Sequence, residues 1–223
     1  MIIVVGGIKG GSGKTTIATN LAVMRSAVGR DVLMIDADDQ ETASDFTILR
    51  NERMPGGAGY TSIKLTGPAV RTETLRLVSK YSDIIIDTGG RDTTSQRAAL
   101  SVANILLVPF VPRSFDVWTL EKVSTLVGEM RAANPELIAY AFLNRADPRG
   151  QDNEDAAGAL QETSELRFVD IPLRTRKAFS NAAAQGMAVT ELKPPDLKAM
   201  DEVVMLYRYL FDTNLTSMQT AEA

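Results

Sequence analysis

Short runs made up mostly of apolar residues recur along this chain, and the spacing between most of them leaves room for a helix. The runs cover residues 2–5, 32–36, 84–87, 105–108 and 138–143, with a further candidate at 168–171. Apolar residues recur at helical spacing over 14–28, 94–102, 115–132, 153–163 and 196–211. Unbroken apolar strands that alternate with helices are typical of a parallel sheet covered on both sides. The pattern predicts an α/β fold, a mostly parallel sheet with helices on both faces, in a single domain over residues 1–223.

The segment after the second apolar run does not follow this alternation. Residues 51–67 are rich in glycine and show little hydrophobic periodicity, which indicates a surface loop. Within this loop we expect at most a short strand, over residues 60–65.

Glycine and lysine dominate the turn after the first apolar run. Residues 9–16 read Lys-Gly-Gly-Ser-Gly-Lys-Thr-Thr and lie between a predicted strand and a predicted helix. Glycines let the backbone N–H groups curl around an anion, while Lys14 can reach phosphates and the Thr15 hydroxyl can bind Mg²⁺. Ile8 stands where the general phosphate-loop pattern has glycine, and Lys9 opens the motif instead. A plain strand-to-helix turn is the alternative, but it would not need both lysines and Thr15.

Polar side chains follow the ends of several other apolar runs. Asp36, Asp87 and Asn144 each stand at such an end, and the carboxyl ends of parallel strands meet at one edge of a sheet. Asp87 could hold Mg²⁺ there, directly or through a water. Asp36 and Asp38 fall on one side of an extended chain, so one could serve the metal and the other could orient a water. Solvated acids at a strand end are the alternative, and Asp39 receives no role.

The amino-acid composition limits the catalytic groups and metal ligands that this chain can supply. The chain contains no cysteine and no histidine, which excludes disulfides, thiolate catalysis and iron–sulfur clusters and removes the usual general base. A metal would then be a hard cation held by oxygen. Because the net charge is −4, nucleic-acid binding would require a local basic patch. No apolar run reaches membrane-spanning length and residues 215–223 are not basic, so we expect a cytoplasmic protein that does not bind membranes.

Residues 9–16, the run Asp36-x-Asp38-x-Gln40 and Asp87 together resemble the ParA/MinD family of deviant-Walker ATPases. Further similarity lies in residues 107–116, 142–145, 170–176 and 182–186, so the resemblance covers nearly the whole chain. It implies a P-loop NTPase fold of the deviant Walker A type, similar to the small ParA-type partition ATPases. ATP and Mg²⁺ are the implied cofactors.

The resemblance also implies a role for each matching residue. Lys9 would be the signature lysine that acts across an ATP-sandwich dimer, in keeping with its place ahead of the loop, from which it can point away from its own nucleotide. With Lys14 and Asp38, which would position the attacking water, it forms the expected catalytic set, and Thr15, Asp36 and Asp87 form the metal set. The expected nucleotide contacts are Gly10, Gly11, Ser12, Gly13, Lys14, Thr15, Thr16, Asn144, Arg145 and Pro172, of which the last three would frame the adenine.

A positioning ATPase is the function that the resemblance implies. ATP would close a homodimer that binds nucleoid DNA without sequence preference, and a ParB-like or adaptor protein would stimulate hydrolysis. The cargo could be a plasmid, a chromosome region or another large body. No arginine is evident beside the phosphate loop, so we expect slow basal hydrolysis that needs a partner. Asp39, Gly89-Gly90 and Arg113-Ser114 depart from residues common in the family, which bears on the rate and the partner.

Basic residues are densest around four positions, and the resemblance makes these the candidate DNA contacts: Arg167, Arg174, Arg176 and Lys177. Surface charges that pair locally are the alternative. Two rival functions stay open. A MinD-like switch on a membrane or protein surface would want a basic amphipathic C-terminal helix for the membrane, which the sequence lacks. An ATP-dependent metabolic enzyme would need a substrate pocket or a glutaminase cysteine.

Overall fold

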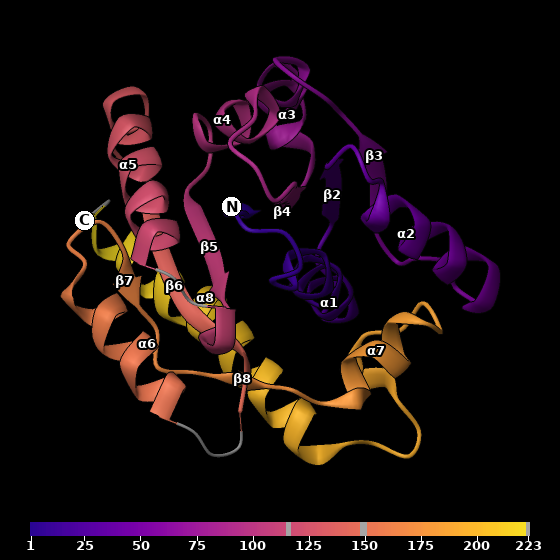
Figure 1. Cartoon of the computed structure of the whole chain (residues 1–223). Helices are drawn as coiled ribbons and strands as arrows, with labels where there is room; N and C mark the ends of the chain where they lie inside the picture. Colours follow the sequence, from indigo (N-terminus) through magenta and orange to yellow (C-terminus); the bar gives the residue numbers. More distant parts are fainter. Residues whose placement is uncertain (115–116, 148–150, 222–223) are drawn as a thin grey trace.

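A parallel sheet forms the centre of the computed structural model of this protein (Figure 1). The structure describes residues 1–114, 117–147 and 151–221, with the backbone alone described at 114, 117 and 213–221. Within these residues eight strands run in the order β3-β2-β4-β1-β5-β6-β7, with β8 also paired to β6, and every pair is parallel. The strands are β1 (Ile2–Val5), β2 (Val32–Ala37), β3 (Thr61–Lys64), β4 (Asp83–Thr88), β5 (Ile105–Phe110), β6 (Ile138–Ala146), β7 (Arg167–Phe168) and β8 (Leu173–Arg174).

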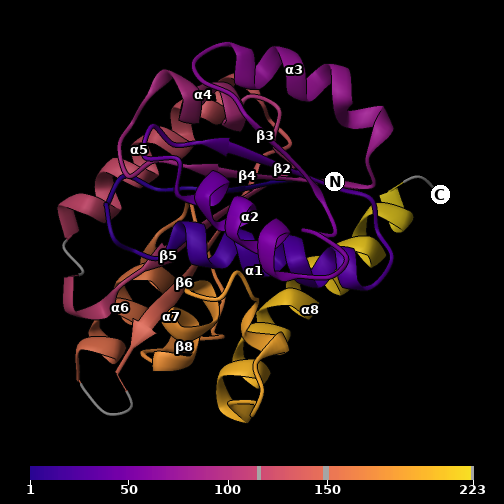
Figure 2. The ribbon, with the colours of Figure 1, turned by 90° about the vertical axis from the view of Figure 1, so that its right-hand side faces the viewer.

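Helices cover both faces of this sheet, which confirms the predicted α/β fold. Figure 2 shows strands β2 and β4 between α3 above and α1 and α2 below. The α-helices are α1 (Lys14–Ala27), α2 (Thr42–Arg53), α3 (Ala69–Leu77), α4 (Thr94–Leu100), α5 (Val117–Ala133), α6 (Gln151–Glu162), α7 (Lys177–Ala183) and α8 (Leu197–Ala221). Short 3-10 turns lie at η1 (Val78–Lys80), η2 (Pro112–Ser114) and η3 (Val189–Glu191). In the described part of the chain, no helix combines the length and the apolar character that crossing a membrane requires.

Successive residues of each strand point to opposite faces and so build two cores. Ile2 and Val4 of β1 pack in a cluster with residues of α3, α4, α5 and α6. Ile3 and Val5 pack in a second cluster with residues of α1 and α8. Because helices cover both faces, the strands are apolar at nearly every position, and this is why they stand out in the sequence as unbroken runs.

Several elements differ from the sequence predictions. Helix α2 was not predicted, because it buries only Ala43, Phe46, Thr47 and Arg50 and therefore shows no clear apolar stripe; its last residues occupy the start of the predicted loop 51–67. Helices α3 and α7 were not predicted either, whereas the short strand expected within 60–65 is confirmed as β3. Residues 115–116 of the predicted helix 115–132 lie outside the described residues.

The predicted strand at 168–171 is confirmed only at its first residue, Phe168, which belongs to β7. Strand β7 ends at Phe168 and β8 begins only at Leu173. Between them the chain turns, and the N–H of Ile171 donates a hydrogen bond of 2.8 Å to the carbonyl of Val169, only two residues earlier. The N–H of Val169 still donates to the carbonyl of Ala141 in β6, but the N–H of Ile171 bonds locally, so the strand ends earlier than predicted.

Candidate nucleotide-binding site

An open cleft of about 540 Å³ lies at the carboxyl edge of the sheet, where the phosphate loop, β2, β4 and β6 end. This is the edge where parallel α/β sheets bind ligands. The residues that line the cleft are Gly10, Gly11, Gly13, Lys14, Thr15, Thr16, Asp38, Asp39, Gln40, Thr42, Gly89, Gly90, Arg91, Thr93 and Arg145. Most of the residues expected around a nucleotide from the sequence therefore come together in one place.

The phosphate loop is held in place by β6. Gly13 has a φ of 91°, a left-handed conformation that favours glycine, and it precedes the first turn of α1. Asn144, at the end of β6, donates from its side-chain nitrogen to the carbonyl of Ser12 at 2.7 Å. A Cβ on residue 13 would collide with that same nitrogen. Asn144 therefore holds the phosphate loop in place through the carbonyl of Ser12, a role that the sequence did not reveal.

Lys14 lies folded against its own loop. Its ammonium donates a hydrogen bond of 2.9 Å to the carbonyl of Lys9, and the side chain is buried. Burial lowers the pKa of the Lys14 ammonium, against the opposing charges of Asp87 and Asp38. The ammonium therefore bonds to the loop backbone and interacts with the charges of Asp87 in β4 and of Asp38, which follows β2.

The surroundings of Asp87 are those expected of a cation ligand. Asp87 is the second-last residue of β4, it is fully buried, and neither of its carboxylate oxygens has a hydrogen-bond partner in the described structure. Burial raises the pKa of this carboxyl to about 7, whereas the Thr15 hydroxyl lowers it and the charge of nearby Asp36 adds to the rise. Two unpartnered buried oxygens are costly unless a cation or water binds them. The donor set of Asp87 and Thr15 fits Mg²⁺, which prefers oxygen ligands.

Asp36 and Asp38 differ in how much of their bonding capacity is already used. Asp36 is level with Asp87 in the strand register, and its carboxylate accepts hydrogen bonds from the N–H and hydroxyl of Ser44 at 2.8 and 2.7 Å. Those bonds anchor the first turn of α2. Asp38 is half-buried, lines the cleft and accepts one bond of 3.2 Å from the N–H of Gln40. No described group of three acidic side chains converges to hold a metal, so Mg²⁺ would take further ligands from phosphate and water.

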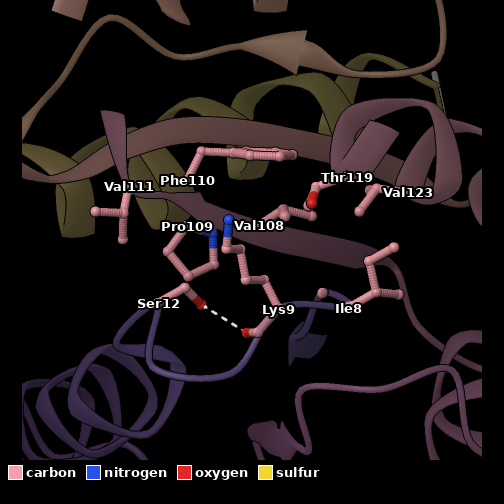
Figure 3. Close-up of a pocket in the computed structure, with 10 residues that line it drawn as sticks. Ile8, Lys9, Ser12, Val108, Pro109, Phe110, Val111, Thr119 and Val123 are labelled. Atoms are coloured by element: carbon pink, nitrogen blue, oxygen red, sulfur yellow. Dashed lines mark hydrogen bonds between the residues drawn. The ribbon is translucent and has the colours of Figure 1, made fainter. Parts of the chain in front are cut away.

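Lys9 lies apart from the phosphate cleft, in a small hollow of its own. Figure 3 shows its side chain pointing from the loop toward β5, where Val108 and Pro109 line the same hollow with Thr119 of α5. Lys9 does not line the cleft that holds Lys14 and Asp38. The hypothesis that Lys9 points away from its own nucleotide agrees with this position.

Two arginines line the phosphate cleft, so the expectation that none lies beside the loop is wrong. Arg145 is the extra residue of a β-bulge between Asn144 and Ala146, and its φ is 54°. Bulges re-aim side chains, and a left-handed non-glycine residue is strained, a combination found at functional sites. Arg91, the second arginine, follows Gly89-Gly90. Pro172 does not line the cleft, although the next residue, Leu173, pairs with Asn144.

Gly90 explains why the chain departs from the family pattern after Asp87. A Cβ at position 90 would lie 2.7 Å from both the N and the Cα of Gly10, and 2.9 Å from the carbonyl carbon of Lys9. Only glycine lets the β4–α4 turn approach the phosphate loop this closely. The Gly-Gly pair in the sequence was the signal of this contact, but it did not show which segment the glycines approach.

The four basic residues expected to bind DNA do not form one patch. Arg174 and Arg176 both bond to Glu202 of α8, and their side chains are 45% and 19% exposed. Arg167 pairs with Tyr140 and Arg174 with Ala146, six positions further along β6, so the two arginines lie up to about 20 Å apart at strand spacing. Lys177 is exposed at the start of α7. The ion pair with Glu202 therefore gives Arg176 a structural role. Of the four expected DNA contacts, Arg174 and Lys177 are the two that are both exposed and close to each other in the chain.

Comparison with known protein families agrees with this geometry. A model of the CobQ/CobB/MinD/ParA nucleotide binding domain matches residues 3–189. The chain belongs to this family. Membership of the CobQ/CobB/MinD/ParA family confirms the resemblance drawn from residues 9–16, Asp38 and Asp87, and it shows that the chain has a nucleotide-binding domain of this family.

Named relatives of the chain within the family include proteins that distribute carboxysomes. "Maintenance of carboxysome distribution protein A" from Gloeobacter kilaueensis is 33% identical over 190 residues, covering 82% of this chain and 81% of the relative. The protein of the same name from Halothiobacillus neapolitanus is 26% identical over 206 residues, covering 90% and 92%. Among solved structures, apo McdA from Cyanothece has a TM-score of 0.76 at 22% identity, covering 92% and 98%. At that identity the structural likeness shows the fold alone.

Proposed function

We propose that this chain is a ParA-like positioning ATPase, with residues 1–223 acting as one ATPase domain. ATP and Mg²⁺ close a homodimer, the dimer binds nucleoid DNA through phosphate contacts, and a ParB-like or adaptor protein stimulates hydrolysis. The relatives that distribute carboxysomes favour a large cytoplasmic body as the cargo over a plasmid. A relative named as a ParA protein, from Rhizobium radiobacter, is 26% identical over 188 residues and keeps DNA cargo among the alternatives.

The position of Lys9 carries this proposal. A lysine that opens a phosphate loop yet lies in a separate hollow against β5 cannot neutralise the phosphates in its own cleft from that position. A second copy of the chain, placed face to face over the cleft, would offer its Lys9 to these phosphates. ATP would then hold the two subunits together, and loss of the γ-phosphate would release them.

Within one subunit we propose four roles, each carried by its own residues. The backbone N–H groups of residues 10–15 and the ammonium of Lys14 hold the β- and γ-phosphates. Thr15 and Asp87 would hold Mg²⁺, which neutralises phosphate charge when bound. Asp38, open to the cleft and only partly engaged, orients the attacking water, while Asp36 fixes the turn that carries Asp38. Asn144 holds the phosphate loop through its bond to Ser12, and Arg145, which lines the cleft, contacts the part of the nucleotide beyond the phosphates.

DNA contacts would come from Arg174 and Lys177, with Arg176 holding Arg174's segment against α8 through Glu202. One subunit of net charge −4 has little general attraction for phosphate. Dimer formation would double the number of these weak sites, and linked sites gain affinity through effective concentration. DNA binding should therefore depend on ATP and fall with salt.

The decisive experiment compares Lys9→Ala with a matched lysine variant, Lys80→Ala, whose exposed side chain lies in η1 at the other edge of the sheet. Light scattering with a non-hydrolysable ATP analogue and Mg²⁺ should give a dimer for the wild type and Lys80→Ala. The Lys9 variant should bind the analogue but stay monomeric. A normal dimer in Lys9→Ala would remove the trans role of this lysine, and a wild type that binds no DNA with any nucleotide would remove the nucleoid step.

A further inference from the structure

Arg91 is a cation of the phosphate cleft that the proposed function has not yet used. It lies in the turn between β4 and α4, four positions after Asp87, and it is exposed. It lines the phosphate cleft together with Gly10, Gly11 and Lys14. It also lines a second cleft of about 450 Å³, between α4 and α5, which includes Lys122 and Glu129.

The backbone around Arg91 is fixed on both sides. On one side Gly90 packs so closely against the phosphate loop that a Cβ there would reach within 2.7 Å of Gly10. On the other side Asp92 accepts two bonds from the Arg97 guanidinium, of 2.7 and 2.6 Å, and Arg97 also pairs with Glu129 at 2.8 Å. The turn therefore holds the Cα of Arg91 in a defined place beside residues 9–10 of the loop.

The same contacts leave the Arg91 guanidinium available. Both acids that line the α4–α5 cleft, Asp92 and Glu129, already bond to Arg97. In the part of the chain that the structure describes, no hydrogen bond or ion pair engages the side chain of Arg91. Lys14, by contrast, already donates to the carbonyl of Lys9. Arg91 is thus a cation of the cleft that can turn toward a bound phosphate without breaking an existing bond.

We propose that Arg91 is a catalytic residue that contacts the γ-phosphate of ATP in its own subunit during hydrolysis. This inference rests on the proposed ATPase function and adds a residue to it. The water oxygen bonds to the γ-phosphorus while the bond to the β–γ bridging oxygen breaks, its electron pair stays with ADP, and one water proton leaves to solvent. Arg91 transfers no proton. Its planar guanidinium donates to the γ-phosphate oxygens, where charge has to be stabilised in the transition state.

The test uses the full chain and the substitution R91A, with K122A as the matched control. Lys122 is an exposed cation of the α4–α5 cleft that does not line the phosphate cleft, so K122A removes the same charge nearby. R91A should lower kcat by roughly a hundredfold or more, the range for loss of a transition-state donor. Its affinity for Mg-ADP should change by less than about threefold, since the γ-phosphate is absent. Millimolar guanidinium should partly restore the rate of R91A and leave K122A unchanged, because a structural role would not respond to it.

A second measurement separates this inference from the proposed function. Mg-ADP with aluminium fluoride mimics the transferring phosphoryl group and needs no turnover. The wild type should bind it more tightly than Mg-ADP alone, and R91A should lose that gain. If R91A keeps both the gain and the wild-type kcat, the role of Arg91 is refuted while the ATPase stands. If the wild type binds neither Mg-ATP nor the aluminium fluoride complex, the proposed function and the role of Arg91 both fail.

Discussion

Asp83 lies at the end of β4 opposite to Asp87, and its replacement should show how much one buried ion pair stabilises this fold. The Asp83 carboxylate accepts a bond of 2.7 Å from Nε of Arg25, and their side chains are only 3% and 9% exposed. The N-terminal ammonium lies 3.4 Å away and Arg30 3.7 Å away. Asp83→Asn keeps the shape of the side chain but leaves the buried Arg25 without its counter-charge.

The expected loss follows from what would remain around Arg25. Breaking a buried pair from one side destabilises a protein by about 3–5 kcal/mol. Arg25 would keep its bond of 3.3 Å to the Tyr207 hydroxyl and its contact with the Phe211 ring, 4.4 Å from the centroid, so we expect the lower end of this range. About 3 kcal/mol corresponds to a fall in Tm of roughly 6–12 °C for a domain of this size.

Urea and thermal unfolding of Asp83→Asn would be compared with Glu73→Gln. Glu73 pairs with Arg76 at 3.0 Å on the surface, where an ion pair contributes at most about 1 kcal/mol. ATP affinity at low temperature should stay at the wild-type value, because Asp83 lies at the far edge of the sheet from the phosphate loop. The reasoning is refuted if Asp83→Asn loses no more stability than Glu73→Gln.

Four further substitutions test the candidate nucleotide site and the candidate DNA contacts. Asp38→Ala should bind ATP and dimerise but release phosphate about 10²–10⁴ times more slowly; turnover at the wild-type rate would make Asp39 the next candidate for holding the water. Gly90→Ala should weaken ATP binding roughly tenfold, because overpacking of about 1–3 kcal/mol must displace the loop; calorimetry would show this beside Gly128→Ala, whose added Cβ meets nothing within 4 Å. Lys177→Glu should weaken binding to unrelated duplexes alike in gel shifts without lowering Tm, whereas Arg176→Glu should lower Tm because it places a second acid against Glu202. Equal melting of these last two variants would contradict the structural role assigned to Arg176.

Much of the sheet could be predicted because its physical cause is local. Strands buried on both faces are apolar at nearly every position, and residues 2–5, 84–86 and 105–108 show this directly. The phosphate loop was equally visible, since its chemistry needs glycines, Lys14 and Thr15 in consecutive positions. Helix α2 escaped prediction because only four of its twelve residues are buried, and the turn at 169–172 escaped because apolar content alone does not distinguish a strand from a buried turn.

The sequence by itself determined which reactive side chains this protein has and which strands they follow. It contains no histidine or cysteine, a phosphate loop that begins with Lys9, and acids after two strands. Only the tertiary structure decided how these groups are used. In the folded chain, Asn144 bonds to the carbonyl of Ser12, 132 residues earlier. Arg174 and Arg176 pair with Glu202, and Arg91 lines the phosphate cleft. Such contacts join segments distant in the chain, and no local pattern of apolar and polar residues specifies which distant partner a side chain will meet.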